Sequence, residues 1–254
     1  MENLVVIIGL FLAGVFAGAI NSVAGGGSLI SFPSLVASGV PAIPANATNT
    51  AAMWPGSLSS AWAYSRETKT NLSLVLTLLV PSAIGALLGA IALVVTPPEL
   101  FDEIVPFLVL FATVLFATRG FFDRLAKPKD GAESVTVLGR VWGFVFQLFV
   151  ATYGGYFGAG IGILMLGSLS IMGMRDIHQM NALKTILAVG INLIAFFYFV
   201  ARGLVIWHIA ILMTIGAIIG GYYGARLARR VDQRILRVFV VVTGLVVSAW
   251  FYVK

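Results

Sequence analysis

The sequence predicts an all-α membrane protein made of two inverted-topology repeats, each a broken helix or re-entrant hairpin followed by about three transmembrane helices. Three observations predict this fold class. The 254 residues are 59% hydrophobic and only 10% charged, whereas a soluble domain has about 25% charged residues. The chain matches itself at one constant spacing. Glycine clusters interrupt two apolar segments, in a chain where a membrane span needs about 20 apolar residues.

The constant spacing is 135 residues, and it relates the two halves of the chain without a gap. Asn46 corresponds to Asn181, and Thr50 corresponds to Thr185. Small or apolar residues make the other matches, which are Ala24/Ala159, Gly25/Gly160, Gly27/Gly162, Leu29/Leu164, Ala47/Ala182, Gly85/Gly220, Gly89/Gly224 and Ala90/Ala225. Small residues recur in membrane helices because they allow close packing. Packing does not explain the Asn and Thr matches, so we interpret the halves as homologous repeats.

The first repeat, residues 1–118, begins with an apolar helix over 4–22. Three successive glycines at 25–27 break this helix, because glycine is among the poorest helix formers. The apolar piece that follows, 29–37, is too short to span a bilayer. Pro33 lies in its first turns, where proline is tolerated. Together these segments predict a broken membrane helix or a re-entrant hairpin.

Three longer helices complete the first repeat, at 45–64, 72–95 and 104–118. Pro81 predicts a kink in the second of them. The loop at 96–103 turns the chain through two successive prolines and carries three acidic residues. This arrangement gives an odd number of crossings per repeat.

The polar segment 119–140 is predicted to link the repeats, because its Pro, Gly, Asp and Lys residues suit a solvated loop. The second repeat, 141–254, follows the plan of the first. We expect a glycine-rich break at 158–162. We expect its helices at 141–157, 163–172, 180–201, 206–227 and 235–253.

The charges of two equivalent loops predict how the chain is oriented. The loop at 96–103 is acidic, whereas its counterpart 135 residues later is basic. The counterpart region contains Arg226, Arg229, Arg230, Arg234 and Arg237. Basic loops remain in the cytoplasm, so the acidic loop is expected outside. Equivalent loops on opposite sides make the repeats inverted, with the linker cytoplasmic and both termini external.

The most distinctive stretch, at 17–33, reads AGAINSVAGGGSLISFP and is followed by GVP at 39–41 and ANATNT at 45–50. In the second half, GAGIG at 158–162 and MNALKT at 180–185 are related to it. These motifs closely resemble those of the sulfite exporter family called TauE/SafE, and the resemblance covers essentially the whole chain. It implies a bacterial inner-membrane protein that moves small sulfur-containing anions, such as sulfite or organosulfonates.

The two copies of the motif differ at the position of greatest chemical interest. The second copy has Lys184 where the first has Asn49, and it has neither three successive glycines nor a proline matching Pro33. An ionisable residue inside a membrane span is costly and usually functional. Lys184 is therefore predicted to pair with a substrate oxygen, the alternative being that it extends to the membrane interface. A desolvated lysine also releases its proton more readily, so Lys184 is the candidate for proton coupling.

The broken-helix ends are predicted to form the rest of the site. Free N–H groups at a helix N-terminus attract anions, and we expect such groups near Ser28 and Leu29 and, in the second repeat, near Ile163. Asn and Thr side chains supply neutral hydrogen bonds, although they also commonly cap helices or bond between them. The candidate substrate-binding residues are Asn21, Ser22, Gly26, Gly27, Ser28, Asn46, Asn49, Thr50, Gly160, Gly162, Asn181, Lys184 and Thr185.

The predicted function is secondary transport of a small oxyanion by alternating access, with a passive anion channel of the same architecture as the alternative. An enzyme is disfavoured, because the spans hold no Asp/Glu pair, Ser/His pairing or metal cluster. Cysteine is absent, which excludes disulfides and thiolate sites. We expect no cofactor, no metal and no nucleic-acid partner. The expected partners are the anion, the bilayer and a coupling proton, and oligomerisation through the glycine faces Gly85/Gly89 or Gly220/Gly224 is left open.

Overall fold

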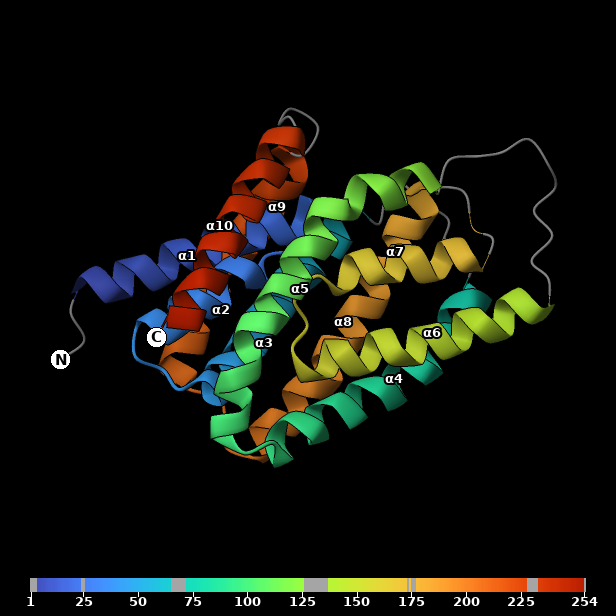
Figure 1. Ribbon diagram of the computed structural model, residues 1–254. Coiled ribbons are helices and arrows are strands. Elements are labelled where there is room, and N and C mark those ends of the chain that lie inside the picture. The colour runs from blue at the N-terminus through green and yellow to red at the C-terminus, as the bar shows by residue number, and fades with distance from the viewer. Residues whose placement is uncertain are drawn as a thin grey trace.

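In the computed structural model, the described residues are 4–23, 26–64, 72–125, 137–172, 174, 177–227 and 233–253. The regular secondary structure of these residues consists of ten helices (Figure 1). They are α1 (Leu4–Val23), α2 (Ser28–Ala37), α3 (Ala42–Tyr64), α4 (Leu72–Val95), α5 (Pro98–Leu125), α6 (Val137–Tyr156), α7 (Ile161–Ile171), α8 (Ile177–Ala201), α9 (Trp207–Leu227) and α10 (Gln233–Val253).

Five helices within the described residues are long and apolar enough to cross a membrane. These candidate spans are Leu4–Ser22, Leu74–Val95, Pro98–Thr118, Ala182–Ala201 and Trp207–Gly224. The helices α2 and α7 have 10 and 11 residues. At about 1.5 Å per residue they are too short to cross the roughly 30 Å hydrocarbon core. The prediction of short helices after the two breaks is confirmed.

The helix α5 differs most from its prediction. It begins at Pro98 rather than at residue 104, so Glu99, Asp102 and Glu103 lie in its first turns and not in a loop. Acidic side chains are favoured there, because the N-terminus of a helix carries partial positive charge. At its other end α5 continues to Leu125. Since α6 already begins at Val137, both ends of the predicted linker 119–140 are helical.

The helix boundaries repeat with the spacing found in the sequence. The helices α8, α9 and α10 each begin 135 residues after α3, α4 and α5. Packing follows the same correspondence: α1 lies along α9 as α6 lies along α4 (Figure 1), and α3 contacts α9 as α8 contacts α4. The helices α3 and α8 contact each other at the centre. Each half therefore packs its helices largely against those of the other half.

The glycine faces of α4 and α9 pack against other helices of the same chain. A Cβ atom on Gly220 would lie 1.9 Å from the Val15 carbonyl oxygen of α1. One on Gly89 would lie 2.0 Å from the Thr152 carbonyl oxygen of α6. The positions in such close contact include Gly85, Gly89, Gly220 and Gly224. The glycines thus allow the helix backbones to approach each other within one chain, as small residues do in membrane proteins.

Candidate functional site

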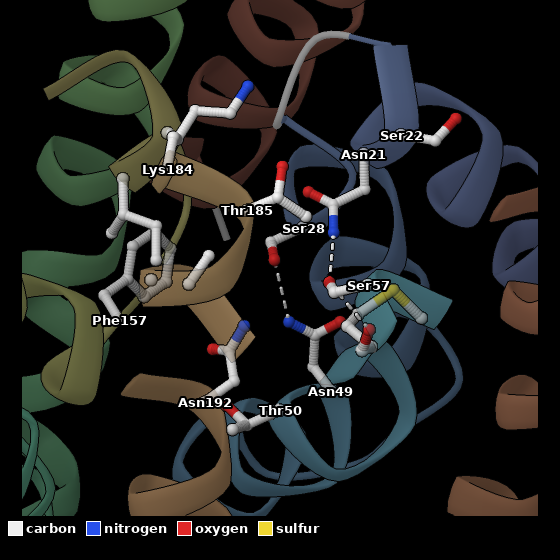
Figure 2. Close-up of a pocket in the computed structure, with 15 residues that line it drawn as sticks. Asn21, Ser22, Ser28, Asn49, Thr50, Ser57, Phe157, Lys184, Thr185 and Asn192 are labelled. Carbon is white, nitrogen blue, oxygen red and sulfur yellow. Dashed lines mark hydrogen bonds between the residues drawn. The ribbon is translucent and has the colours of Figure 1, made fainter. Parts of the chain in front are cut away.

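A cavity of about 50 Å³ lies between α3 and α8, beside both helix breaks (Figure 2). This volume is several times the roughly 10–15 Å³ that one water needs. It is far below the roughly 300 Å³ typical of a pocket for a drug-sized ligand. Its size therefore suits a small solute.

Two matching rows of residues form most of the cavity wall. One helical face of α3 provides Asn49, Thr50, Met53 and Ser57, and one face of α8 provides Lys184, Thr185, Ala188 and Asn192. Each residue of the second row follows its counterpart in the first by 135 positions. The shared spacing of i, i+1, i+4 and i+8 places each row on one side of its helix. The cavity is thus built from equivalent positions of the two halves.

The first break brings the N-terminus of α2 to the cavity, where Ser28 lines the wall. Gly27 caps this helix without any side-chain bond, and a Cβ atom there would lie 2.2 Å from the Ala17 carbonyl oxygen. The Leu29 N–H donates to the Gly26 carbonyl oxygen at 3.1 Å. The expectation of a free N–H group at Leu29 is therefore wrong, because a tight turn already satisfies it.

The second break has the same consequence. Gly158 and Gly160 both have φ of +79°, a left-handed conformation that glycine adopts without steric cost. The Ile163 N–H donates to the Gly160 carbonyl oxygen at 3.0 Å, so it is not free either. Phe157, Gly158, Ile161 and Gly162 line the cavity. The breaks contribute the ends of two helices, and the specific donors must come from side chains.

Asn49 joins α3 to the beginning of α2. Its Oδ1 accepts a hydrogen bond from Ser31 Oγ at 2.5 Å, and its Nδ2 donates to Ser28 Oγ at 3.2 Å. Because Ser28 Oγ accepts this bond, its own hydrogen remains available to donate. The Asn49 amide has a second N–H as well. Asn49 therefore both holds the break in place and supplies donors to the cavity.

Three hydroxyl groups of the wall are already committed as donors. Ser22, Thr50 and Ser57 each donate to a backbone carbonyl of their own helix, at 2.7, 3.0 and 3.1 Å. Asn21 Nδ2 in turn donates to Ser57 Oγ at 2.9 Å. These hydroxyl oxygens can only accept a hydrogen bond from a solute. Their main effect is to hold α1 and α3 in register around the cavity.

Lys184 provides the formal charge of the cavity wall. No Asp or Glu among the described residues lines the cavity. The Lys184 side chain is only 8% exposed, which argues against extension to the membrane surface. Figure 2 shows Lys184 at one end of the cavity and Thr50 with Asn192 at the other. The wall is therefore positive at one end and neutral at the other.

Asn46 is directed away from the cavity. Its Nδ2 donates to the Tyr156 carbonyl oxygen at 2.8 Å, at the last residue of α6. Thr48 behaves similarly, because its Oγ1 accepts the Ile206 N–H at 3.0 Å just before α9. Both bonds satisfy backbone groups at helix ends, which otherwise lack partners.

The other candidate residues divide between the wall and its supports. Those in the wall are Asn21, Ser22, Ser28, Asn49, Thr50, Gly162, Lys184 and Thr185. Gly26, Gly27 and Gly160 shape the two breaks without lining the cavity. The side chain of Asn181 lies outside the described residues.

Sequence reasoning overlooked Met53, Ser57 and Phe157 as wall residues, and it favoured packing for Asn192. A signal for Asn192 was present, because it follows Lys184 by eight positions and so lies on the same helical face. It also corresponds to Ser57 in the 135-residue repeat.

Comparison with known proteins agrees with this arrangement. The family model described as "Sulfite exporter TauE/SafE" matches residues 10–251. The chain belongs to the TauE/SafE family. It is 32% identical over 244 residues to "Probable membrane transporter protein ORF9" of a Sinorhizobium species, a match that covers 94% of this chain and 89% of that protein. This TauE/SafE protein is therefore a multi-pass membrane transporter, and its family is not an enzyme class.

Two further TauE/SafE relatives match over nearly the whole chain. A "Probable membrane transporter protein" of Haemophilus influenzae is 27% identical, with 96% of each chain covered. "Probable membrane transporter protein YfcA" of Escherichia coli K12 is 29% identical, with 94% of this chain and 87% of that protein covered. No solved structure matches the chain.

Proposed function

We propose that this TauE/SafE protein is a secondary transporter that exports a small sulfur-containing oxyanion, such as sulfite or an organosulfonate. The observation that carries the proposal is the buried Lys184 in a small cavity whose described wall is otherwise uncharged. At the low effective dielectric of a protein interior, an ammonium group strongly favours an anion over a cation. Neutral Ser and Asn donors then bind the remaining oxygens.

Alternating access is the transport mechanism that the proposal adopts. The halves are taken as inverted repeats, on the evidence of the opposite loop charges and the matched residues of α3 and α8. A site shared by two such repeats is exposed first to one side and then to the other when they rock against each other. The chain is placed in the bacterial inner membrane, with the linker cytoplasmic and both termini external.

An electrochemical gradient is the proposed energy source. The sequence contains no nucleotide-binding motif. Moving one elementary charge through a potential of 100 mV is worth about 2.3 kcal/mol, and an inside-negative membrane therefore drives an anion outward. Protons are the proposed coupling ion, with Lys184 as the group that exchanges them.

The test measures uptake of labelled sulfite, methanesulfonate and sulfate into liposomes containing the purified protein, with and without a pH gradient. Saturable uptake of one anion is expected for the wild type, and a dependence on the pH gradient supports proton coupling. Lys184→Met removes the charge at similar length and is expected to lower uptake at least tenfold. Lys184→Arg keeps the charge and serves as the matched control.

Two results would contradict parts of this proposal. Continuous, non-saturating anion conductance in a planar bilayer would replace the carrier with the channel alternative. Absence of uptake for all three anions by a folded wild-type protein would refute oxyanion transport itself.

A further inference from the structure

Asn192 stands out among the residues of the cavity wall because its amide is not paired. It lies well inside the candidate span Ala182–Ala201, and its side chain is half-buried. No hydrogen bond joins this side chain to any residue that the structure describes. A polar amide removed from water without a partner is destabilising. Its presence in an apolar span calls for a partner inside the cavity.

The equivalent position in the first half shows what a paired residue looks like there. Ser57 corresponds to Asn192, and it is held by Asn21 at 2.9 Å. The counterpart of Asn21 in the second half is Tyr156. The Tyr156 hydroxyl instead lies 3.3 Å from Thr96 Oγ1. The structural partner that satisfies the first position is therefore not used at the second.

Asn192 lies near the other available donors of the cavity. In Figure 2 its amide is at the same end as Asn49, with Ser28 above them, and all three line the cavity. The Asn49 and Ser28 bonds leave one N–H and one O–H free to donate. Asn192 adds two N–H donors from the opposite helix. These three residues form the neutral donor set, at the end of the cavity away from Lys184.

We infer that Asn192 contacts the transported anion and sets its selectivity, as the α8 member of this neutral donor set. The inference rests on the proposed function. Lys184 attracts the anion into the cavity, and the neutral donor set binds its oxygens there. Uncharged donors bind an oxyanion without adding a second buried positive charge, so the anion can leave again. The number of donors the set offers then distinguishes anions with different numbers of accepting oxygens.

The experiment compares Asn192→Leu, Asn192→Asp and the wild type in the liposome assay, with Met53→Leu as the control. Leu keeps the approximate size of Asn and removes its donors. Asp keeps the shape and replaces the donors with a negative charge. Met53 lines the same cavity without a polar group. Thermal unfolding in detergent, with and without each of the three anions, is measured for every variant.

The expected result is an ordered loss of anion affinity. Asn192→Leu is expected to raise KM about tenfold, the value of one neutral hydrogen bond of roughly 1.4 kcal/mol. Asn192→Asp is expected to raise it further, and the ratio of KM values among sulfite, methanesulfonate and sulfate is expected to change in both variants. Anion-induced thermal stabilisation should fall in the same order, while Met53→Leu behaves as the wild type.

The failure of this inference is distinguishable from failure of the proposed function. Wild-type KM values and selectivity in both Asn192 variants, with an active wild type, would overturn only the assignment of Asn192. A lowered unfolding temperature with unchanged KM and selectivity would overturn it too, because that pattern indicates a structural role. A wild type that neither transports nor binds any of the three anions would overturn both proposals.

Discussion

Gly18 controls how closely α1 can approach α9, and Gly18→Ala tests this contact. A Cβ atom at Gly18 would lie 2.3 Å from the carbonyl oxygen of Ala217 and 2.7 Å from its Cα. Both are backbone atoms of α9, so no side-chain rotation can relieve the clash. Gly9, also in α1, is the matched control, because a Cβ atom there meets nothing within 4 Å.

The size of the effect follows from these distances. Ordinary contact begins at 3.4 Å, so α1 and α9 must separate by about 1 Å at Gly18. Overpacking of this kind costs about 1–3 kcal/mol, and replacing Gly with Ala inside a helix returns about 0.5–1 kcal/mol. We expect Gly18→Ala to destabilise the protein by about 1–2 kcal/mol. We expect Gly9→Ala to leave stability unchanged or raise it by up to about 1 kcal/mol.

The separation of α1 from α9 should also reach the cavity. The Ala217 carbonyl oxygen lies 2.9 Å from where a Cβ atom of Gly56 would be, and Gly56 belongs to α3. A displaced α9 therefore presses on the helix that carries Asn49 and Ser57. We expect lower anion uptake in Gly18→Ala and normal uptake in Gly9→Ala.

The assay is reversible unfolding in mixed micelles of mild detergent and SDS, followed by circular dichroism. The two variants should shift the unfolding midpoint in opposite directions, or the control should not shift at all. Equal destabilisation by both substitutions would refute the reasoning, because the calculated difference lies entirely in the contact with α9.

Three further predictions concern the breaks and the orientation. Asn49→Ala removes the bonds to Ser31 and Ser28, and it should lower both the unfolding midpoint and anion uptake. A loss of uptake without destabilisation would contradict its role in holding α2. Gly160→Ala places a side chain at φ +79°, at a cost of about 1–2 kcal/mol, measured by the same unfolding assay. Because the chain lacks cysteine, Glu99→Cys and Arg226→Cys can each be labelled alone in intact cells. An impermeant maleimide should modify only the former, and the reverse pattern would invert the proposed topology.

The helical architecture could be predicted largely from the sequence. Its apolar runs exceed what a soluble protein can hold, and glycine and proline limit the helices because of their backbone properties, which are local. The 135-residue spacing places Ala42 and Ile177, the first residues of α3 and α8, at equivalent positions. Lys184 was identified as a wall residue for a similar reason, since the cost of burying a charge depends little on the details of packing.

Only the tertiary structure decided which polar residues face the cavity. Asn46 and Asn49 belong to one cluster, yet Asn46 binds the end of α6 while Asn49 lines the cavity. Residues three apart in a helix lie close to the same face, so their different roles depend on where α6 ends. The Leu29 N–H was misjudged because the turn that satisfies it depends on the conformation of the break. The sequence by itself determined the helices, the repeat and the buried charge, which are set by local backbone preference and by transfer from water. The directions of the side chains depend on contacts between helices far apart in the chain, and those contacts exist only in the folded protein.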